Sequence, residues 1–313
     1  EVYEITAPYG YVLSDEIHAV ELVYAGQNVA VTETAIAVYN ERQTATLSMQ
    51  KMLETNELFG IGNNGEIKKV VFGLYAAEEL VATNGAAIPV DGLIEVIHFD
   101  ENGLATIQTD LPLGKYYVKE IATDEHYILN SDKYEFGFDY AGQEIVCVSL
   151  AVNGGEPIEN EIIYGSVSGL KTTETEEALA GAVIGLFKND ETVFTMDTAL
   201  MTTTSAEDGS FSFANVPYGT WLVREIQQPE GFILNETVFD VVITENAQVI
   251  EIDIANAFIR GNITLTKVDA DYPENKLTGA TFEVYKDVNA DGVIDDGDEL
   301  MGSMAEKETG IYE

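Results

Sequence analysis

A short stretch with one glutamate among apolar residues occurs three times in this chain and constrains the fold more than any other feature. The copies are VYEITAPYGYVL at 2–13, YYVKEIATDEHYIL at 116–129 and WLVREIQQPEGFIL at 221–234. They contain Glu4, Glu120 and Glu225, and each glutamate is followed by a turn and an aromatic–apolar pair. A buried carboxylate is costly unless it has a partner. The stretches therefore predict basic or amide partners at matching positions elsewhere in the chain.

The expected partners occur in a fixed order. Lysines end three similar stretches, ATLSMQK, GSVSGLK and GNITLTK, at Lys51, Lys171 and Lys267. Asparagines follow the glutamates at Asn40, Asn160 and Asn256. Each asparagine lies 11 residues before the next lysine. The repeated order of lysine, glutamate and asparagine indicates a tandem array of similar domains.

Short runs of alternating apolar and polar residues predict β-strands with one buried face. Examples are AVELVYA at 19–25 and VAVTETAIAVY at 29–39, and no long stretch has helical periodicity. We therefore predict an all-β chain of tandem antiparallel β-sandwich domains in series. The marker residues divide the chain into the C-terminal half of a domain (1–42), two complete domains (43–162 and 163–258) and the N-terminal part of a further domain (259–313).

The composition excludes several classes of function. With 55 acidic and 15 basic residues the formal charge is −40, which argues against binding nucleic acid or an anionic membrane. The chain contains no run of about 18–20 apolar residues, which a membrane-spanning helix would need. The single cysteine, Cys147, excludes an intramolecular disulfide and is expected to be a small core residue. No catalytic signature of a hydrolase or a nucleotide-binding enzyme is present, so we do not expect an enzyme.

The repeat resembles the Cna B-type (SpaA-like, prealbumin-like) domains of Gram-positive surface adhesins and pilins. Besides the lysine, glutamate and asparagine stretches, the similar segments are GAVIGLFK at 181–188, GSFSFANVPYG at 209–219, PEGFIL at 229–234 and GATFEVYK at 279–286. The resemblance covers essentially the whole chain and is weakest over 52–110. It implies immunoglobulin-like sandwiches on the cell surface.

In the resembled family, the lysine and asparagine side chains join spontaneously in an isopeptide bond, and the glutamate shuttles protons. The resemblance assigns two such sites, Lys51–Glu120–Asn160 and Lys171–Glu225–Asn256, with Asn153 as a competitor for Asn160. Glu4 and Asn40 lack their lysine, and Lys267 lacks its glutamate and asparagine. Burial suits this chemistry, because it favours a neutral lysine amine and a protonated carboxyl. The alternative is that each trio is an ordinary buried salt bridge or a set of unrelated surface residues.

The segment DVNADGVIDDGDE at 287–299 has the spacing of a calcium-binding loop. The side chains of Asp287, Asn289, Asp291, Asp295 and Asp298 and the carbonyl of Val293 are the expected ligands, with a glycine, Gly292, at the bend. Position 12 is Asp298 rather than the usual glutamate, and no helices flank the loop. The alternative is a solvated acidic hairpin. The sequence therefore predicts calcium as a cofactor and no organic cofactor.

These observations favour a structural stalk segment of a cell-wall-associated adhesin or pilin-like protein. Its partners would be the neighbouring repeats, and a host or matrix ligand would bind through regions not present. The protein would be extracellular and anchored to the cell wall, with the secretion and anchoring signals absent from this segment. The alternative is a ligand-binding adhesin module in which the acidic loops of 52–110 recognise a host protein or a glycan.

Overall fold

The computed structural model describes residues 1–313, and its regular secondary structure is β-strand apart from two short segments. The exceptions are two single-turn 3₁₀ segments, η1 at Glu66–Lys69 and η2 at Val152–Gly155. This confirms the predicted all-β class. None of the helical segments is long and apolar enough to cross a membrane. The chain forms two compact units, one of Glu1–Pro229 with Leu234–Asn256 and one of Glu230–Ile233 with Ala257–Glu313.

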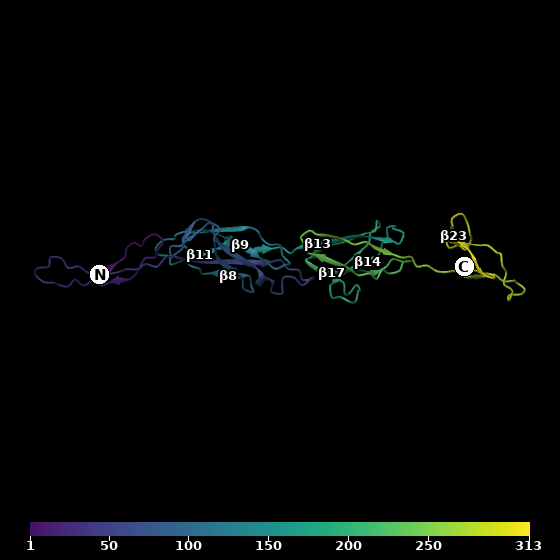
Figure 1. The fold of residues 1–313 in the computed structure, drawn as a ribbon, viewed down its shortest axis with the longest axis horizontal. Coiled ribbons are helices and arrows are strands. Elements are labelled where there is room, and N and C mark those ends of the chain that lie inside the picture. The colour runs from purple at the N-terminus through teal and green to yellow at the C-terminus, as the bar shows by residue number, and fades with distance from the viewer. The chain divides into compact units, whose positions relative to one another are not determined.

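The first sandwich is built from two four-stranded sheets and lies between residues 44 and 160 (Figure 1). One sheet has the order β10-β9-β4-β7; in the other, β3 pairs with β11, β12 and β8. The strands are β3 Thr44–Leu53, β4 Val71–Ala76, β7 Leu93–His98, β8 Leu104–Ile107, β9 Gly114–Ala122, β10 Lys133–Phe138, β11 Cys147–Ala151 and β12 Ile158–Asn160, with a hairpin of β5 Leu80–Val81 and β6 Ala87–Ile88.

The second sandwich repeats this arrangement (Figure 1). One sheet has the order β15-β14-β17-β18; in the other, β13 pairs with β16, β19 and β20. Its strands are β13 Tyr164–Thr173, β14 Val183–Lys188, β15 Met201–Thr204, β16 Ser210–Pro217, β17 Gly219–Gln227, β18 Phe239–Ile243, β19 Val249–Glu251 and β20 Ile254–Asn256.

The first and last strands of each sandwich lie side by side and run parallel. β3 pairs in parallel with β11 and β12, and β13 does so with β19 and β20. All other strand pairs in the two sandwiches are antiparallel, as the sequence predicted. A parallel pair needs a long connection. Here the whole domain is that connection, because it separates the two strands in the sequence.

The alternation of side chains along β3 and β9 directs polar residues into the core. In β3, Leu47 and Met49 face inward, and Lys51 follows them on the same face. In β9, Val118 and Glu120 share the inner face. Successive side chains of a strand point to opposite faces, so the apolar residues of each strand determine where its lysine or glutamate points. The polar residues are buried because their strands are amphipathic.

Cys147 is not a core residue. It is exposed at the start of β11, whereas its neighbours Val148 and Leu150 pack against the core. The sequence indicated the alternation correctly but not which of the two faces was buried. A shift of one residue exchanges the faces of a strand.

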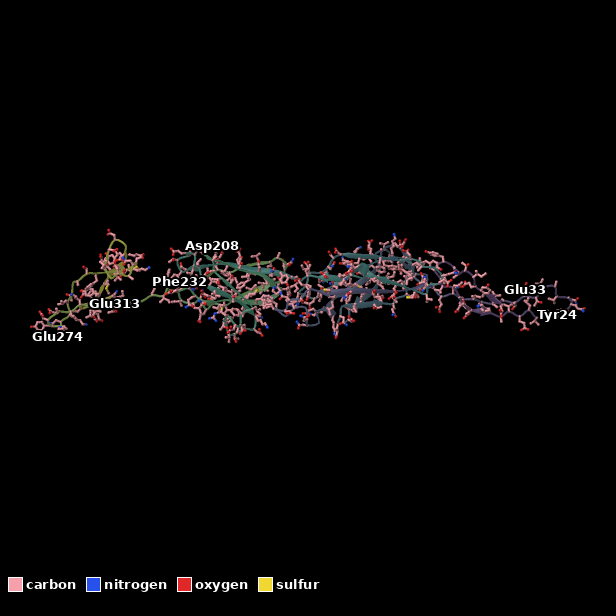
Figure 2. The ribbon with its side chains drawn as sticks, turned by 180° about the vertical axis from the view of Figure 1, so that it is seen from behind. Tyr24, Glu33, Asp208, Phe232, Glu274 and Glu313 are labelled. Carbon is pink, nitrogen blue, oxygen red and sulfur yellow. The ribbon has the colours of Figure 1, made fainter.

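The predicted strands at 19–25 and 29–39 are not formed. Residues 1–42 contain only the short pair β1 (Val2–Tyr3) and β2 (Ile17–His18) and a single bridge from Tyr11 to Arg42. Figure 2 labels Tyr24 and Glu33 on the irregular part, and 77% of the Tyr24 surface is exposed. A strand requires a neighbouring strand for its hydrogen bonds, and no strand pairs with these residues.

The second unit contains two small sheets. In one, β25 (Ile311–Tyr312) lies between β21 (Leu265–Thr266) and β24 (Glu306–Glu308); in the other, β22 (Phe282–Lys286) pairs with β23 (Glu299–Met304). Tyr312 is buried and contacts the ring of Phe282 edge-on.

Candidate functional site

The second sandwich buries a lysine, a glutamate and an asparagine together. Lys171 of β13, Glu225 of β17 and Asn256 of β20 have relative exposures of 0, 1 and 1%. The Lys171 amine donates hydrogen bonds to Asn256 Oδ1 at 2.6 Å and to the Ile254 carbonyl at 3.1 Å. The Asn256 amide donates to Glu225 Oε1 at 2.8 Å, and Lys171 Nζ lies 3.8 Å from that same oxygen. The trio is a closed network within the core.

The register of the parallel pair places the lysine and asparagine side chains next to each other. Lys171 lies opposite Ile254, and Asn256 lies two residues further along β20. Residues two apart share one face of a strand, so Asn256 and Ile254 both lie beside the lysine. Glu225 comes from the other sheet, and the site therefore spans the two layers of the sandwich.

The first sandwich contains an equivalent trio of Lys51, Glu120 and Asn160, each with no more than 2% exposure. The Lys51 amine donates to Asn160 Oδ1 at 2.9 Å and to two main-chain carbonyls. The Asn160 amide donates to both Glu120 oxygens, at 2.9 and 3.0 Å, and to Thr123 Oγ1 at 3.0 Å. Asn153, the competitor suggested by the sequence, is exposed in η2, and its amide donates to the carbonyls of Glu156 and Pro157.

Burial shifts the pKa values of Lys51, Lys171 and Glu120 in the direction that favours their neutral forms. Desolvation lowers the pKa of the Lys51 amine to about 8, although the charges of Glu120 and Glu159 act in the opposite direction. It also lowers the pKa of Lys171 and raises the pKa of Glu120. A proton can therefore move from lysine to carboxylate at a much smaller cost than in water.

The orientation of the asparagine amide distinguishes between two roles for the glutamate. In both trios the amide oxygen accepts from the lysine, and the amide nitrogen donates to the carboxylate. A protonated glutamate could either hydrogen-bond the amide oxygen, which makes the amide carbon more electrophilic, or carry protons to the leaving ammonia. The contacts place the carboxylate beside the nitrogen that would leave, which is the position for a proton donor to that nitrogen.

A third partner of the glutamate was missed from the sequence. The main-chain N–H ten residues after the glutamate donates to its Oε2: Asn130 to Glu120 at 2.6 Å and Asn235 to Glu225 at 2.8 Å. The sequence did contain a sign of this hydrogen bond, because the tripeptide Ile-Leu-Asn follows the glutamate at the same distance in both domains. This bond holds Oε2 in both sites, while the asparagine amide donates to Oε1 in both and, in the first sandwich, to Oε2 as well.

Glycines hold the main chain of the lysines. The N–H groups of Lys51 and Lys171 donate to the carbonyls of Gly103 and Gly209, each at 2.7 Å. Gly209 has a φ of +78°, and a Cβ there would lie 2.4 Å from the Lys171 carbonyl oxygen. Only glycine fits this position without displacing the lysine.

The unpaired members of the repeat form partial sites. Glu4 Oε2 accepts from Asn40 Nδ2 at 2.5 Å and from the Ser14 N–H at 2.9 Å, and no lysine occurs among residues 1–42. Lys267 is exposed, and its N–H donates to the Gly310 carbonyl at 2.8 Å, as the other two lysines do to their glycines.

The predicted calcium ligands are engaged by their own loop. Asp287 accepts from the N–H groups of Asp291 and Gly292, and Asp298 accepts from those of Val288 and Asp295. Neither here nor elsewhere in the chain do three or more His, Cys, Asp or Glu side chains form a group that could hold a metal ion. Calcium binding at 287–298 stays a prediction from the sequence.

Comparisons with known proteins agree with this architecture. The family described as SpaA: Prealbumin-like fold domain matches residues 61–149 and 165–257, which together are more than half of the chain. No curated protein sequence matches the chain.

Solved structures with a similar fold include the Bacillus anthracis TIE protein, with a TM-score of 0.61 and 20% identity over 87% of this chain. This chain spans less than half of that structure, 43% of its length. GBS52, the minor pilin of Streptococcus agalactiae, matches 70% of this chain and 98% of its own length, with 16% identity and a TM-score of 0.30. A C-terminal fragment of the pilus adhesin SpaC from Lactobacillus rhamnosus GG matches 71% of this chain and its own full length, with 15% identity and a TM-score of 0.43.

Proposed function

Because the chain belongs to the SpaA prealbumin-like fold domain family, we propose that it is a load-bearing stalk segment of a bacterial surface protein, stabilised by two self-formed isopeptide bonds. The bonds join Lys51 to Asn160 and Lys171 to Asn256. The observation that carries the proposal is the pair of buried trios, in which each lysine amine lies within hydrogen-bonding distance of the asparagine amide and each amide contacts the glutamate.

The reaction needs only the three side chains of each site. The lysine ammonium gives a proton to the glutamate, and the neutral amine attacks the asparagine Cγ. The Nζ–Cγ bond forms and the Cγ–Nδ2 bond breaks; the carboxyl gives its proton to the departing nitrogen and accepts the second proton of Nζ, which then leaves with the ammonia as ammonium. The glutamate ends unchanged. Each site turns over once, on its own chain, so the protein is not an enzyme in the usual sense.

Position supplies most of the rate. The fixed register keeps amine and amide in contact, which makes a bimolecular step effectively intramolecular. The core excludes water, so the attacking amine is not solvated and the carboxyl has few competing partners. No metal or organic cofactor is required by this chemistry.

The mechanical role follows from which strands are joined. Each bond would link the first strand of a sandwich to its last, closing loops of 109 and 85 residues. Tension that enters at the lysine strand would then leave through the asparagine strand, and the sheets between would carry little of it. A surface stalk needs this property, and we place the protein outside the cell on that basis.

The intact mass of the denatured chain tests the proposal. Each bond expels one ammonia, about 17 Da, so two bonds give a deficit of about 34 Da. The double variant Glu120→Ala, Glu225→Ala should show the full mass calculated from its sequence, with no loss of ammonia. An unmodified mass in the parent chain would remove the proposed chemistry.

A further inference from the structure

We propose that a small hairpin of the first sandwich, residues 56–61, is a latch that docks on the second sandwich and holds the two sandwiches as one rigid body. The surface on which it docks contains Trp221, and both sandwiches belong to the same compact unit. The inference goes beyond the proposed function and does not depend on the cross-links, because the hairpin lies outside both trios. A latch stiffens the joint between the sandwiches, which a bond within one sandwich cannot do.

The latch lies in a connection that is longer in the first sandwich than in the second. The connection from β3 to β4 covers residues 54–70 and that from β13 to β14 covers residues 174–182, so the first is eight residues longer (17 against 9). The longer connection contains one aromatic residue, Phe59, and the shorter one contains none. The second sandwich forms the same two sheets without the extra residues. Their role therefore lies outside the sandwich that carries them.

Hydrogen bonds hold the hairpin in a defined shape. The main-chain N–H of Asn56 donates to the Ile61 carbonyl at 2.9 Å, and the N–H of Ile61 donates to the Asn56 carbonyl at 3.0 Å. The N–H of Phe59 donates to Asn56 Oδ1 at 3.4 Å, and the next residue, Gly60, has a φ of +72°, which glycine adopts without strain. Ile61 is buried in the first core. The hairpin is therefore anchored on the first sandwich and presents Phe59 in its turn.

The two sandwiches share the Phe59 side chain. It packs against the hydrophobic cores of both. Its ring meets the Trp221 ring edge-on, with 4.8 Å between the centroids and 75° between the planes. The Trp221 indole N–H donates to the Pro217 carbonyl at 2.9 Å, which holds the indole in place on the second sandwich. Edge-on aromatic pairs are favourable at this separation, and burying both rings removes apolar surface from water.

Polar groups also tie the base of the hairpin to the second sandwich. The hydroxyl of Tyr164, the first residue of β13, donates to the Glu54 carboxylate at 3.1 Å and accepts from Asn56 Nδ2 at 3.3 Å. A second ring pair crosses the joint, with His126 of the first sandwich edge-on to Tyr218 of the second. Glu54 is exposed, so water competes for its hydrogen bonds. The ring of Phe59 is therefore the part of the joint that excludes water.

The linker between the sandwiches is short, and its main chain is bonded to both of them. Three residues separate β12 from β13. The N–H of Ile162 donates to Glu54 and that of Ile163 to the His126 carbonyl, each at 2.8 Å, and the Ile163 carbonyl accepts from the Tyr218 N–H at 2.8 Å. Linked domains move relative to each other unless a firm interface prevents it. Such a linker leaves only a small range of motion for the latch to suppress.

The single tryptophan of the chain reports on the latch directly. Trp221 is 9% exposed with Phe59 in place. In the full chain, Phe59→Ala should uncover the indole, so that its emission shifts to longer wavelength and acrylamide quenches it more strongly. Leu58→Ala is the matched control, because Leu58 is the neighbouring residue of the hairpin and is 52% exposed. This variant should change neither property.

Residual dipolar couplings of the main-chain N–H groups test the rigid body itself. In the parent chain and in Leu58→Ala, the couplings of the two sandwiches should fit one alignment tensor. In Phe59→Ala, each sandwich should require its own tensor. Phe59→Leu keeps an apolar side chain against the first core and should give a smaller change in the same direction. It provides the same comparison if Phe59→Ala does not fold.

A single tensor in the folded Phe59 variant would overturn the inference, because the sandwiches would then stay fixed without the ring. Two tensors in the parent chain would also overturn it, as would unchanged emission and quenching of Trp221 in that variant. The intact mass of the same samples is a separate result. A missing ammonia deficit in the parent chain would refute the proposed function and leave the latch standing.

Discussion

Pulling single molecules from their two ends gives the most direct test of the stalk, because a cross-linked loop cannot lengthen. The perturbation is the double variant Glu120→Ala, Glu225→Ala, which removes the proton carrier from both sites. If the bonds form, the residues between each lysine and its asparagine should stay closed under tension in the parent chain. In the variant both loops should open.

The expected lengths follow from the spacing of the bonded residues. The loops span 85 and 109 residues, and an extended chain covers about 3.3–3.6 Å per residue, so the two opening events should add about 280–310 Å and about 360–390 Å. The loop-closure entropy lost with each bond, taken by analogy with a disulfide of that size, is about 4.5–5 kcal/mol. The variant should therefore also unfold at a lower denaturant concentration.

The assay is force spectroscopy with the mass of each sample measured beforehand. Lys171→Arg alone is a matched control. It should show only the shorter lengthening, from the loop of the second sandwich, because the first sandwich keeps its bond. If the parent chain shows both events although its mass is 34 Da low, then the bonds join other residues and the reasoning fails.

Four further results are expected. In Asn160→Ala, which cannot form the first bond, the free energy of unfolding should rise by up to about 3 kcal/mol as the pH increases from about 8 to about 10.5, because in this range the unfolded chain keeps the Lys51 proton and the folded chain does not. Melting temperatures measured across this pH range would check the rise, and a rise that persists after Lys51→Met would show that Lys51 is not its cause. Gly209→Ala should destabilise the protein more than Gly181→Ala and slow the loss of ammonia in the second sandwich. Both glycines have a positive φ, which costs an alanine about 1–2 kcal/mol, but only at Gly209 would the new methyl group also meet the Lys171 carbonyl. Equal destabilisation by the two variants would count against this contact. Asn235→Pro should slow ammonia loss in the second sandwich alone, because it removes the N–H that holds Glu225, whereas Asn235→Ser, which keeps that N–H, should not. The intact mass followed over time from synthesis would separate the two variants. Calcium should bind the 287–298 loop saturably in titration calorimetry and lose affinity in Asp287→Ala with Asp291→Ala; no heat in the parent chain would show that the loop is an acidic hairpin.

Much of the fold could be predicted because the alternation of apolar and polar residues is visible within the sequence of each strand. Alternation along β3 and β9 indicated strands, and the conjunction of lysine, glutamate and asparagine in a fixed order indicated that the same domain occurs repeatedly. The prediction was wrong at 29–39, where a good strand sequence has no neighbour to bond with, and at Cys147, where the pattern left open which face was buried. Both errors concern what lies beside a strand, which its own sequence does not contain.

The sequence by itself determined the residue types of the site and their order along the chain. Only the tertiary structure decided that Asn160 rather than Asn153 meets Lys51, because parallel pairing of β12 with β3 sets the register. It also decided that the amide nitrogen faces the carboxylate and that a main-chain N–H ten residues on fixes the carboxylate. The physical reason is range: periodicity and residue type act along a few neighbouring residues, whereas a reactive contact between residues 109 apart exists only once two sheets have packed around it.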